Sequence, residues 1–114
     1  MITVDGVRRL VATFPRAYEA LVRDQIKFRV GSLAFVSFSR DESLMGFAFP
    51  KDERADLVAS RPDTFQLPRP SDMRYQWVVA RTEALEPDEM RELVIDAWRM
   101  VVPKGVAREF LGED

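Results

Sequence analysis

Residues 25–49 read QIKFRVGSLAFVSFSRDESLMGFAF and contain the clearest structural pattern in the chain. The first six residues alternate between polar and apolar, which is typical of a strand with one buried face. Gly31-Ser32 predicts a two-residue hairpin turn, and the polar run Arg40–Ser43 predicts a second turn. The segments Leu33–Ser39 and Leu44–Phe49 are rich in residues that favour strands. The stretch therefore predicts three consecutive antiparallel strands.

Helical patterns flank these strands. Before them, apolar residues recur at helical spacing from Val4 to Phe14, and Thr3 can cap this helix. After them, Pro50 suits a first helical position, so we expect a helix to about Ser60 that buries Ala55, Leu57 and Val58. The longest predicted helix begins at Pro87, and its apolar stripe consists of Met90, Leu93, Val94, Ala97, Trp98 and Val101. A short final helical turn is expected at Lys104–Leu111.

Two more strands complete the prediction, a short one at Phe65–Leu67 and a clearer one at Tyr75–Ala80. The order α-β-β-β-α-β-β-α is too short and too rich in hairpins for parallel crossovers. It predicts a single α+β domain over residues 1–114, with an antiparallel sheet in one layer and helices in the other. We expect the sheet to contribute Phe28, Val30, Phe35, Phe47, Phe49, Trp77 and Val79 to the core. We expect the last long helix to contribute Leu93, Val94, Ala97 and Trp98.

The composition excludes most catalytic and metal chemistry. The chain has no cysteine and no histidine, so it lacks a thiol nucleophile, a disulfide, the commonest general base and the commonest zinc ligands. Its five glycines are too far apart to build a phosphate-binding loop. A serine nucleophile paired with Lys104 stays open on composition alone, but strand hydroxyls explain the serines better. We therefore expect a protein that is not an enzyme and holds no metal or cofactor.

The apolar stretches are far shorter than a membrane span, and charged residues interrupt the region where a secretory signal would lie. A cytoplasmic location without membrane contact is the expectation. The net charge is -2, yet the charge is unevenly distributed. Residues 1–40 carry +4 and residues 61–81 carry +2, whereas residues 82–114 carry -5. The uneven charge indicates either an ordinary solvated surface or a basic patch for an acidic partner.

Three stretches, taken in order, carry a resemblance. They are FRVGSLAF at 28–35, Pro62 and Phe65 followed by YQWV at 75–78, and DAWR at 96–99 followed by VPK at 102–104. Together they resemble the MmcQ/YjbR family of small bacterial proteins. The resemblance implies an α-β(3)-α-β(2)-α fold of the secretion-chaperone type, similar to a double-wing transcription-factor domain. It also implies DNA binding, which is the label that the family commonly carries, although Ser32 and Ala48 stand where relatives often have basic residues.

Charge and resemblance together predict weak, largely sequence-independent DNA binding. Phosphate contacts are expected from Lys27 and Arg29 on the polar face of the first predicted strand, and from Arg69 and Arg74 in the Pro-rich loop. Lys104 and Arg108 extend this patch only if the C-terminal turn folds towards it. Affinity should fall by roughly tenfold to a thousandfold between about 50 and 200 mM salt.

Two alternatives to DNA binding remain open. One is a protein-interaction domain, for which the chaperone-like fold is the argument. The other is a small-ligand pocket between the helices and the sheet, supported by Trp77 and Trp98, although tryptophans in such stripes more often belong to the core. Nucleic-acid binding requires a contiguous basic patch, whereas protein interaction requires an exposed apolar patch or a sheet edge that can pair.

Overall fold

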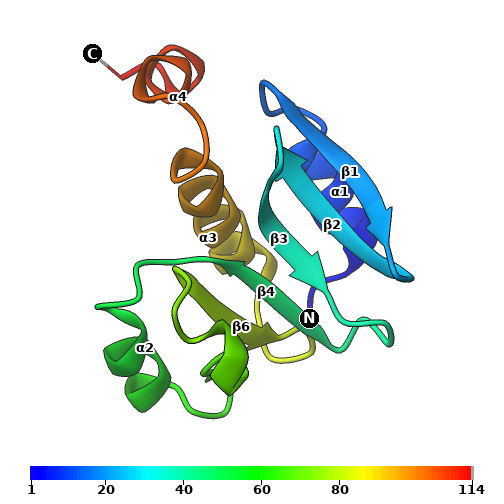
Figure 1. Ribbon diagram of the computed structural model, residues 1–114, viewed down its shortest axis with the longest axis vertical. Helices are drawn as coiled ribbons and strands as arrows, with labels where there is room; N and C mark the ends of the chain where they lie inside the picture. Colours follow the sequence, from blue (N-terminus) through cyan, green and yellow to red (C-terminus); the bar gives the residue numbers. More distant parts are fainter. Residues whose placement is uncertain (114) are drawn as a thin grey trace.

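The computed structural model describes residues 1–113, in which six strands and four α-helices are formed (Figure 1). The elements are α1 (Val4–Val11), β1 (Ala17–Val22), β2 (Gln25–Val30), β3 (Leu33–Phe38), β4 (Leu44–Ala48), α2 (Arg54–Ser60), β5 (Phe65–Gln66), the 3-10 turn η1 (Pro70–Asp72), β6 (Trp77–Arg81), α3 (Pro87–Arg99) and α4 (Lys104–Leu111). The strands form one sheet in the order β1-β2-β3-β4-β6-β5, and every pair is antiparallel. The predicted α+β fold class is confirmed.

Helices α1 and α3 cover one face of the sheet and enclose the core (Figure 1). Helix α1 packs on β1 and α3, while α3 packs on β3 and β4. The predicted contributions of Phe28, Val30, Phe35, Phe47, Val94, Ala97 and Trp98 are confirmed, because all seven are buried. Phe49 and Leu93 are partly buried at the margin of this core. A register shift between β2 and β3 after Phe28 lets the consecutive residues Phe35 and Val36 both be buried.

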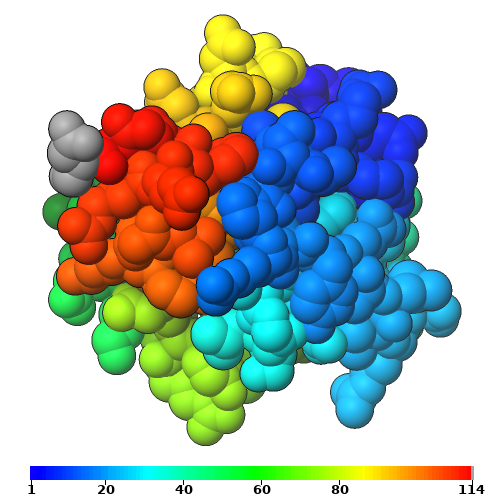
Figure 2. Space-filling view, turned by 90° about the horizontal axis from the view of Figure 1, so that it is seen from above, coloured from blue at the N-terminus to red at the C-terminus, as the bar shows by residue number. Residues whose placement is uncertain are grey.

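The C-terminal helix α4 is held by an aromatic cluster. The ring of Phe110 lies 5.8 Å from that of Phe14 and 5.4 Å from that of Trp98, measured between centroids. The Trp98 indole donates a hydrogen bond of 3.1 Å to the carbonyl of Pro15. Figure 2 shows the orange and red C-terminal residues against the blue segment that follows α1. The helix expected at Lys104–Leu111 is therefore formed, and it packs against the segment that follows α1.

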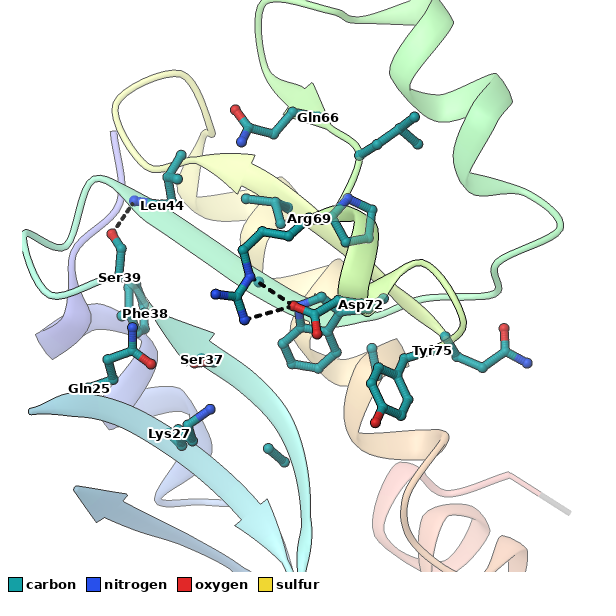
Figure 3. A pocket seen from close by; sticks show the side chains of 18 of the residues that line it. Gln25, Lys27, Ser37, Phe38, Ser39, Leu44, Gln66, Arg69, Asp72 and Tyr75 are labelled. Atoms are coloured by element: carbon teal, nitrogen blue, oxygen red, sulfur yellow. Dashed lines mark hydrogen bonds and ion pairs between the residues drawn. The ribbon is translucent and has the colours of Figure 1, made fainter. Parts of the chain in front are cut away.

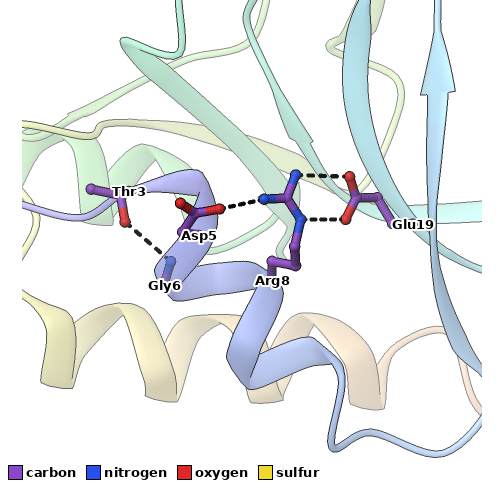
Figure 4. Close-up of polar contacts among 5 residues, drawn as sticks. All are labelled: Thr3, Asp5, Gly6, Arg8 and Glu19. Atoms are coloured by element: carbon purple, nitrogen blue, oxygen red, sulfur yellow. Dashed lines mark hydrogen bonds and ion pairs between the residues drawn. The ribbon is translucent and has the colours of Figure 1, made fainter.

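Polar contacts hold helix α1 at its N-terminus and against strand β1 (Figure 4). The predicted cap is confirmed, since Thr3 Oγ1 accepts a hydrogen bond of 3.1 Å from the Gly6 N–H. Arg8 donates two hydrogen bonds, of 2.6 and 2.9 Å, to the carboxylate of Glu19 on β1 and also pairs with Asp5. These bonds lower the pKa of the Glu19 carboxyl. Helix α1 is thereby fastened to the edge strand of the sheet.

Strand β1 was not predicted, so four strands precede α2 where the sequence and the resemblance indicated three. It pairs along its whole length with β2, from Ala17 opposite Val30 to Val22 opposite Gln25. The turn between them places Arg23 and Asp24 at φ 52° and 66°, a left-handed conformation that usually attracts glycine or asparagine. The hairpin was missed because its turn lacks those residues.

The predicted face of the sixth strand was wrong. Val78 and Ala80 are fully buried under the helices, whereas Trp77 and Val79 are partly exposed on the opposite face. Ala80 pairs with Met45 on one side and Phe65 on the other. A small residue is needed between two such large neighbours, and this packing decides which face of β6 is buried.

The bounds of the second helix also differ from the prediction. It begins at Arg54 and not at Pro50, and Ala55 is exposed while Leu57 and Val58 are partly buried. Its one fully buried residue within the described chain is Arg54, with 6% of its surface exposed. This unexpected buried charge lies next to the candidate site.

Candidate functional site

The face of the sheet opposite α1 and α3 is hollowed by an open cavity of about 660 Å³ (Figure 3). Strands β2, β3, β4 and β6 form its floor, because alternate residues of each strand point away from the helices. The Pro-rich segment 67–76 forms one wall, and Met100 and Val101 after α3 close one end. Its floor residues include Lys27, Ser37, Gly46, Ala48, Trp77 and Val79.

Trp77 and Gly46 form the aromatic centre of this cavity. The indole covers the glycine so closely that a Cβ atom on Gly46 would lie 2.5 Å from Trp77 Nε1 and 2.9 Å from Cε2. Strand β4 therefore needs glycine at this position. With the sheet backbone on one side and the cavity on the other, the indole forms an apolar platform that a ligand can reach.

A second aromatic side chain, Tyr75, lies at the rim of the cavity. It is exposed, and Arg74 holds it in place by two contacts. The Arg74 guanidinium lies 4.8 Å from the ring centroid and donates a hydrogen bond of 2.8 Å to the phenolic oxygen. Such a cation over the ring orients an exposed aromatic side chain.

Arg54 anchors the wall that carries these residues. Its buried guanidinium donates hydrogen bonds to the carbonyls of Tyr75 at 2.8 Å and Trp77 at 3.2 Å, and also to the carbonyl of Met73. All three acceptors lie in the turn that leads into β6. Helix α2 thus fixes the loop against the sheet from behind.

Cationic side chains enter the cavity from two separate elements. Figure 3 shows Lys27 extending from β2 and Arg69 extending from the Pro-rich loop on the other side of the cavity. Arg69 donates from Nε and Nη2 to Asp72, with both distances 3.2 Å. Among the lining residues, all of which lie in the described chain, Asp72 is the one carboxylate.

Further positive charge surrounds Lys27. Burial lowers the pKa of its ammonium group, the charges of Arg29, Arg69 and Arg23 lower it further, and Asp72 raises it. Arg29 shares the open face with Lys27 because it lies two residues along the same strand. Its buried Nε has no hydrogen-bond partner within residues 1–113. The arginines and the lysine therefore form a cluster that carries more cations than carboxylates.

The structure brings together only some of the predicted site residues. Lys27 and Arg69 line the same cavity, and Arg29 is adjacent to Lys27. Arg74 instead supports Tyr75 from outside the cavity. Lys104 and Arg108 lie on α4, and neither is among the lining residues.

Sequence reasoning missed Gly46 and Arg54. It named Trp77 for a small-ligand pocket between the helices and the sheet, whereas the cavity that Trp77 lines lies on the opposite face of the sheet. A glycine inside an otherwise large-residue strand signals close approach by a neighbour, which could have indicated the platform. No comparable signal marks Arg54.

Clustered metal ligands and membrane-spanning helices are both absent from the described residues 1–113. Within these residues, three or more acidic side chains never gather closely enough to hold a metal ion. No helix in the same part of the chain is long and apolar enough to cross a membrane.

Comparisons with known proteins agree with the fold described above. No curated protein matches the chain. The crystal structure of Deinococcus radiodurans protein DR2400, whose family-model domain is DUF419, superposes with a TM-score of 0.78 at 19% sequence identity. That match covers 100% of this chain and 91% of the other and supports the architecture alone. The family model YjbR matches residues 12–100, so the chain belongs to the YjbR family, as its sequence indicated.

Proposed function

We propose that the open face of the sheet binds nucleic acid weakly and largely without sequence preference. The observation that carries this proposal is that Lys27 and Arg69 line one cavity, with Arg29 next to Lys27 and with Asp72 as the single lining carboxylate among the described residues. A partly buried cation that lies among other cations gains free energy when an anion joins it. Because phosphates are regularly spaced along a strand, a polynucleotide supplies several such anions at once.

The proposed role is binding without catalysis. Asp72 is engaged by Arg69, and the chain contains no histidine or cysteine that could act as a general base or nucleophile beside it. A nucleic-acid ligand also favours the cytoplasm as the place where the domain acts.

The salt dependence of binding follows from the number of phosphate contacts. Two to four contacts reduce the affinity by about 10- to 100-fold between about 50 and 200 mM salt, because each contact releases condensed counterions. This reduction in affinity is at the lower end of the one expected from the sequence, because Arg74, Lys104 and Arg108 do not line the cavity and add no phosphate contacts there.

A fluorescence-anisotropy titration with labelled oligonucleotides at several salt concentrations tests the proposal. The variant Lys27→Gln/Arg69→Gln should bind more weakly and reduce the slope of log K against log salt by about 1.4, since each phosphate of a single strand that is no longer neutralised lowers it by about 0.7. The matched control is Arg9→Gln/Arg91→Gln, which removes the same charge from exposed positions on α1 and α3. Equal weakening in both variants would show that only net charge matters. Absence of binding by the unmodified protein at low salt would exclude the proposal.

A second candidate function, protein interaction, is supported by the apolar rim of the same cavity. Leu33 is 56% exposed, and Leu67 and Met100 are also exposed beside it. Exposed apolar side chains around a groove are typical of protein-binding surfaces. This candidate becomes the preferred one if the titration shows no nucleic-acid binding.

A further inference from the structure

We infer that the cavity receives an unpaired nucleobase stacked on Trp77, so that the ligand of this face is single-stranded nucleic acid. The inference rests on the proposed function and specifies its ligand. It depends on the platform, on the position of the cations relative to it, and on the shape of the cavity.

The platform formed by the Trp77 indole over Gly46 suits a flat apolar ligand group. Trp77 lies directly over Gly46, and small side chains, Ala34 and Ala48, line the floor near it. Larger residues at these positions would fill the space above the sheet. Tyr75 at the rim adds a second exposed ring whose orientation is fixed by Arg74. Exposed aromatic side chains are the platforms on which successive bases stack in single-strand-binding proteins.

Cationic side chains line the same cavity as this platform. Lys27 enters from β2 and Arg69 enters from the loop on the other side of the cavity, so a base on Trp77 would have cations in the same cavity for its flanking phosphates (Figure 3). The amide side chains of Gln25 and Gln66 also line the cavity and can exchange hydrogen bonds with base edges. These amides can both donate and accept, so they favour binding that tolerates different bases.

The shape of the cavity separates single strands from duplexes. In a duplex the faces of the bases are covered by stacking, and only their edges are accessible from the grooves. An aromatic platform at the floor of a cavity can therefore be reached only by a base that has left the stack. A cavity of about 660 Å³ is of the size that encloses a small organic group.

Intrinsic fluorescence tests the inference without any substitution. Trp98 is fully buried in the aromatic cluster with Phe14 and Phe110, whereas Trp77 faces the cavity. Titration of the protein with oligothymidylate at low salt should quench the emission of Trp77 and leave that of Trp98 unchanged. A duplex of equal length should quench little and bind more weakly. Thymidine 5′-monophosphate is the third probe and distinguishes a strand from a free nucleotide.

Two variants complete the test, each checked for folding by circular dichroism. Trp77→Leu should weaken oligothymidylate binding by roughly 5- to 150-fold, which corresponds to the loss of one base stack. Trp77→Phe keeps an aromatic platform and should retain most of the affinity. The slope of affinity against salt should stay unchanged in both, because the phosphate contacts are intact.

The outcomes separate this inference from the function on which it rests. Equal binding of duplex and single strand, with Trp77→Leu unaffected and Lys27→Gln/Arg69→Gln impaired, overturns the stacking and leaves the electrostatic surface. Quenching by the mononucleotide with no binding of strands overturns the single-strand ligand in favour of a free nucleotide. No binding of any nucleic acid overturns both proposals.

Discussion

The buried guanidinium of Arg54 is expected to determine the stability of the wall beside the cavity. In Arg54→Met the side chain keeps its length but cannot donate to the carbonyls of Met73, Tyr75 and Trp77. A hydrogen bond from a charged donor contributes about 1.5 to 3 kcal/mol to the free energy of unfolding. Part of this lost stability is regained, because the variant no longer buries a charge and the freed carbonyls can bind water. A net destabilisation of about 2 to 4 kcal/mol follows. With an unfolding entropy of roughly 2.1 cal/mol/K per residue, the melting temperature should fall by about 8 to 17 °C.

Thermal unfolding followed by circular dichroism measures this shift, and Arg91→Met is the matched control on the exposed surface of α3. Limited trypsin digestion provides a local measurement, since Arg74 lies in the wall that Arg54 holds, between Met73 and Tyr75. Cleavage after Arg74 should be faster in Arg54→Met than in the control. A melting temperature within about 2 °C of the unmodified protein, with unchanged cleavage, would refute the view that Arg54 anchors the loop.

Gly46→Ala should displace the Trp77 indole from the sheet and destabilise the fold by about 1 to 3 kcal/mol, seen as a red-shifted emission and stronger acrylamide quenching. Phe110→Ala should lower the free energy of unfolding by about 1 to 2 kcal/mol, because α4 loses its packing against the buried cluster, and a urea titration would detect no change if α4 were independent. The hydrogen bonds of the 39–43 turn lower the pKa of Asp41 to about 2, so their stabilisation is complete above the ordinary value of 3.8 and is lost as pH falls towards 2. Asp41→Asn should remove this part of the dependence of melting temperature on pH. Lys27→Met should raise the melting temperature at pH 7, because the folded state lowers the pKa of Lys27 and so disfavours its charged form, and a decrease would contradict this sign.

The central strands could be predicted because the local sequence pattern of each strand and turn agrees with its packing in the folded protein. The turn at Gly31 adopts φ 60°, which glycine accepts without strain, and the alternating residues of β2 place Phe28 and Val30 in the core. The missing strand β1 shows the opposite case. Its residues are half-exposed on the sheet edge, and its turn uses Arg23 and Asp24 in a conformation that the sequence does not signal. Pairing with β2 stabilises this hairpin, and such pairing is not encoded locally.

The site was only partly predictable for a related reason. Lys27 and Arg69 could be named from charge, but their shared cavity depends on a loop whose position is set by Arg54 from another helix. The role of Trp77 depends on which face of β6 is buried. Trp77 and Ala80 are both compatible with a core position, and the large neighbours of Ala80 decide between them. Periodicity within a single strand contains no information about those neighbours.

The two faces of the sheet differ in a way that favours a binding role for the open one. Under the helices, large apolar side chains pack without a buried unpaired polar side-chain atom in the described residues. On the open face, Arg29 has an unpartnered buried Nε, and Lys27 lies among other cations. An unpartnered buried donor and neighbouring like charges reduce the stability of the folded protein, and a purely structural sheet face does not require them. An anionic ligand would pair these cations, and a stacked base would cover the exposed indole. The same groups that weaken the free protein therefore provide the free energy for binding.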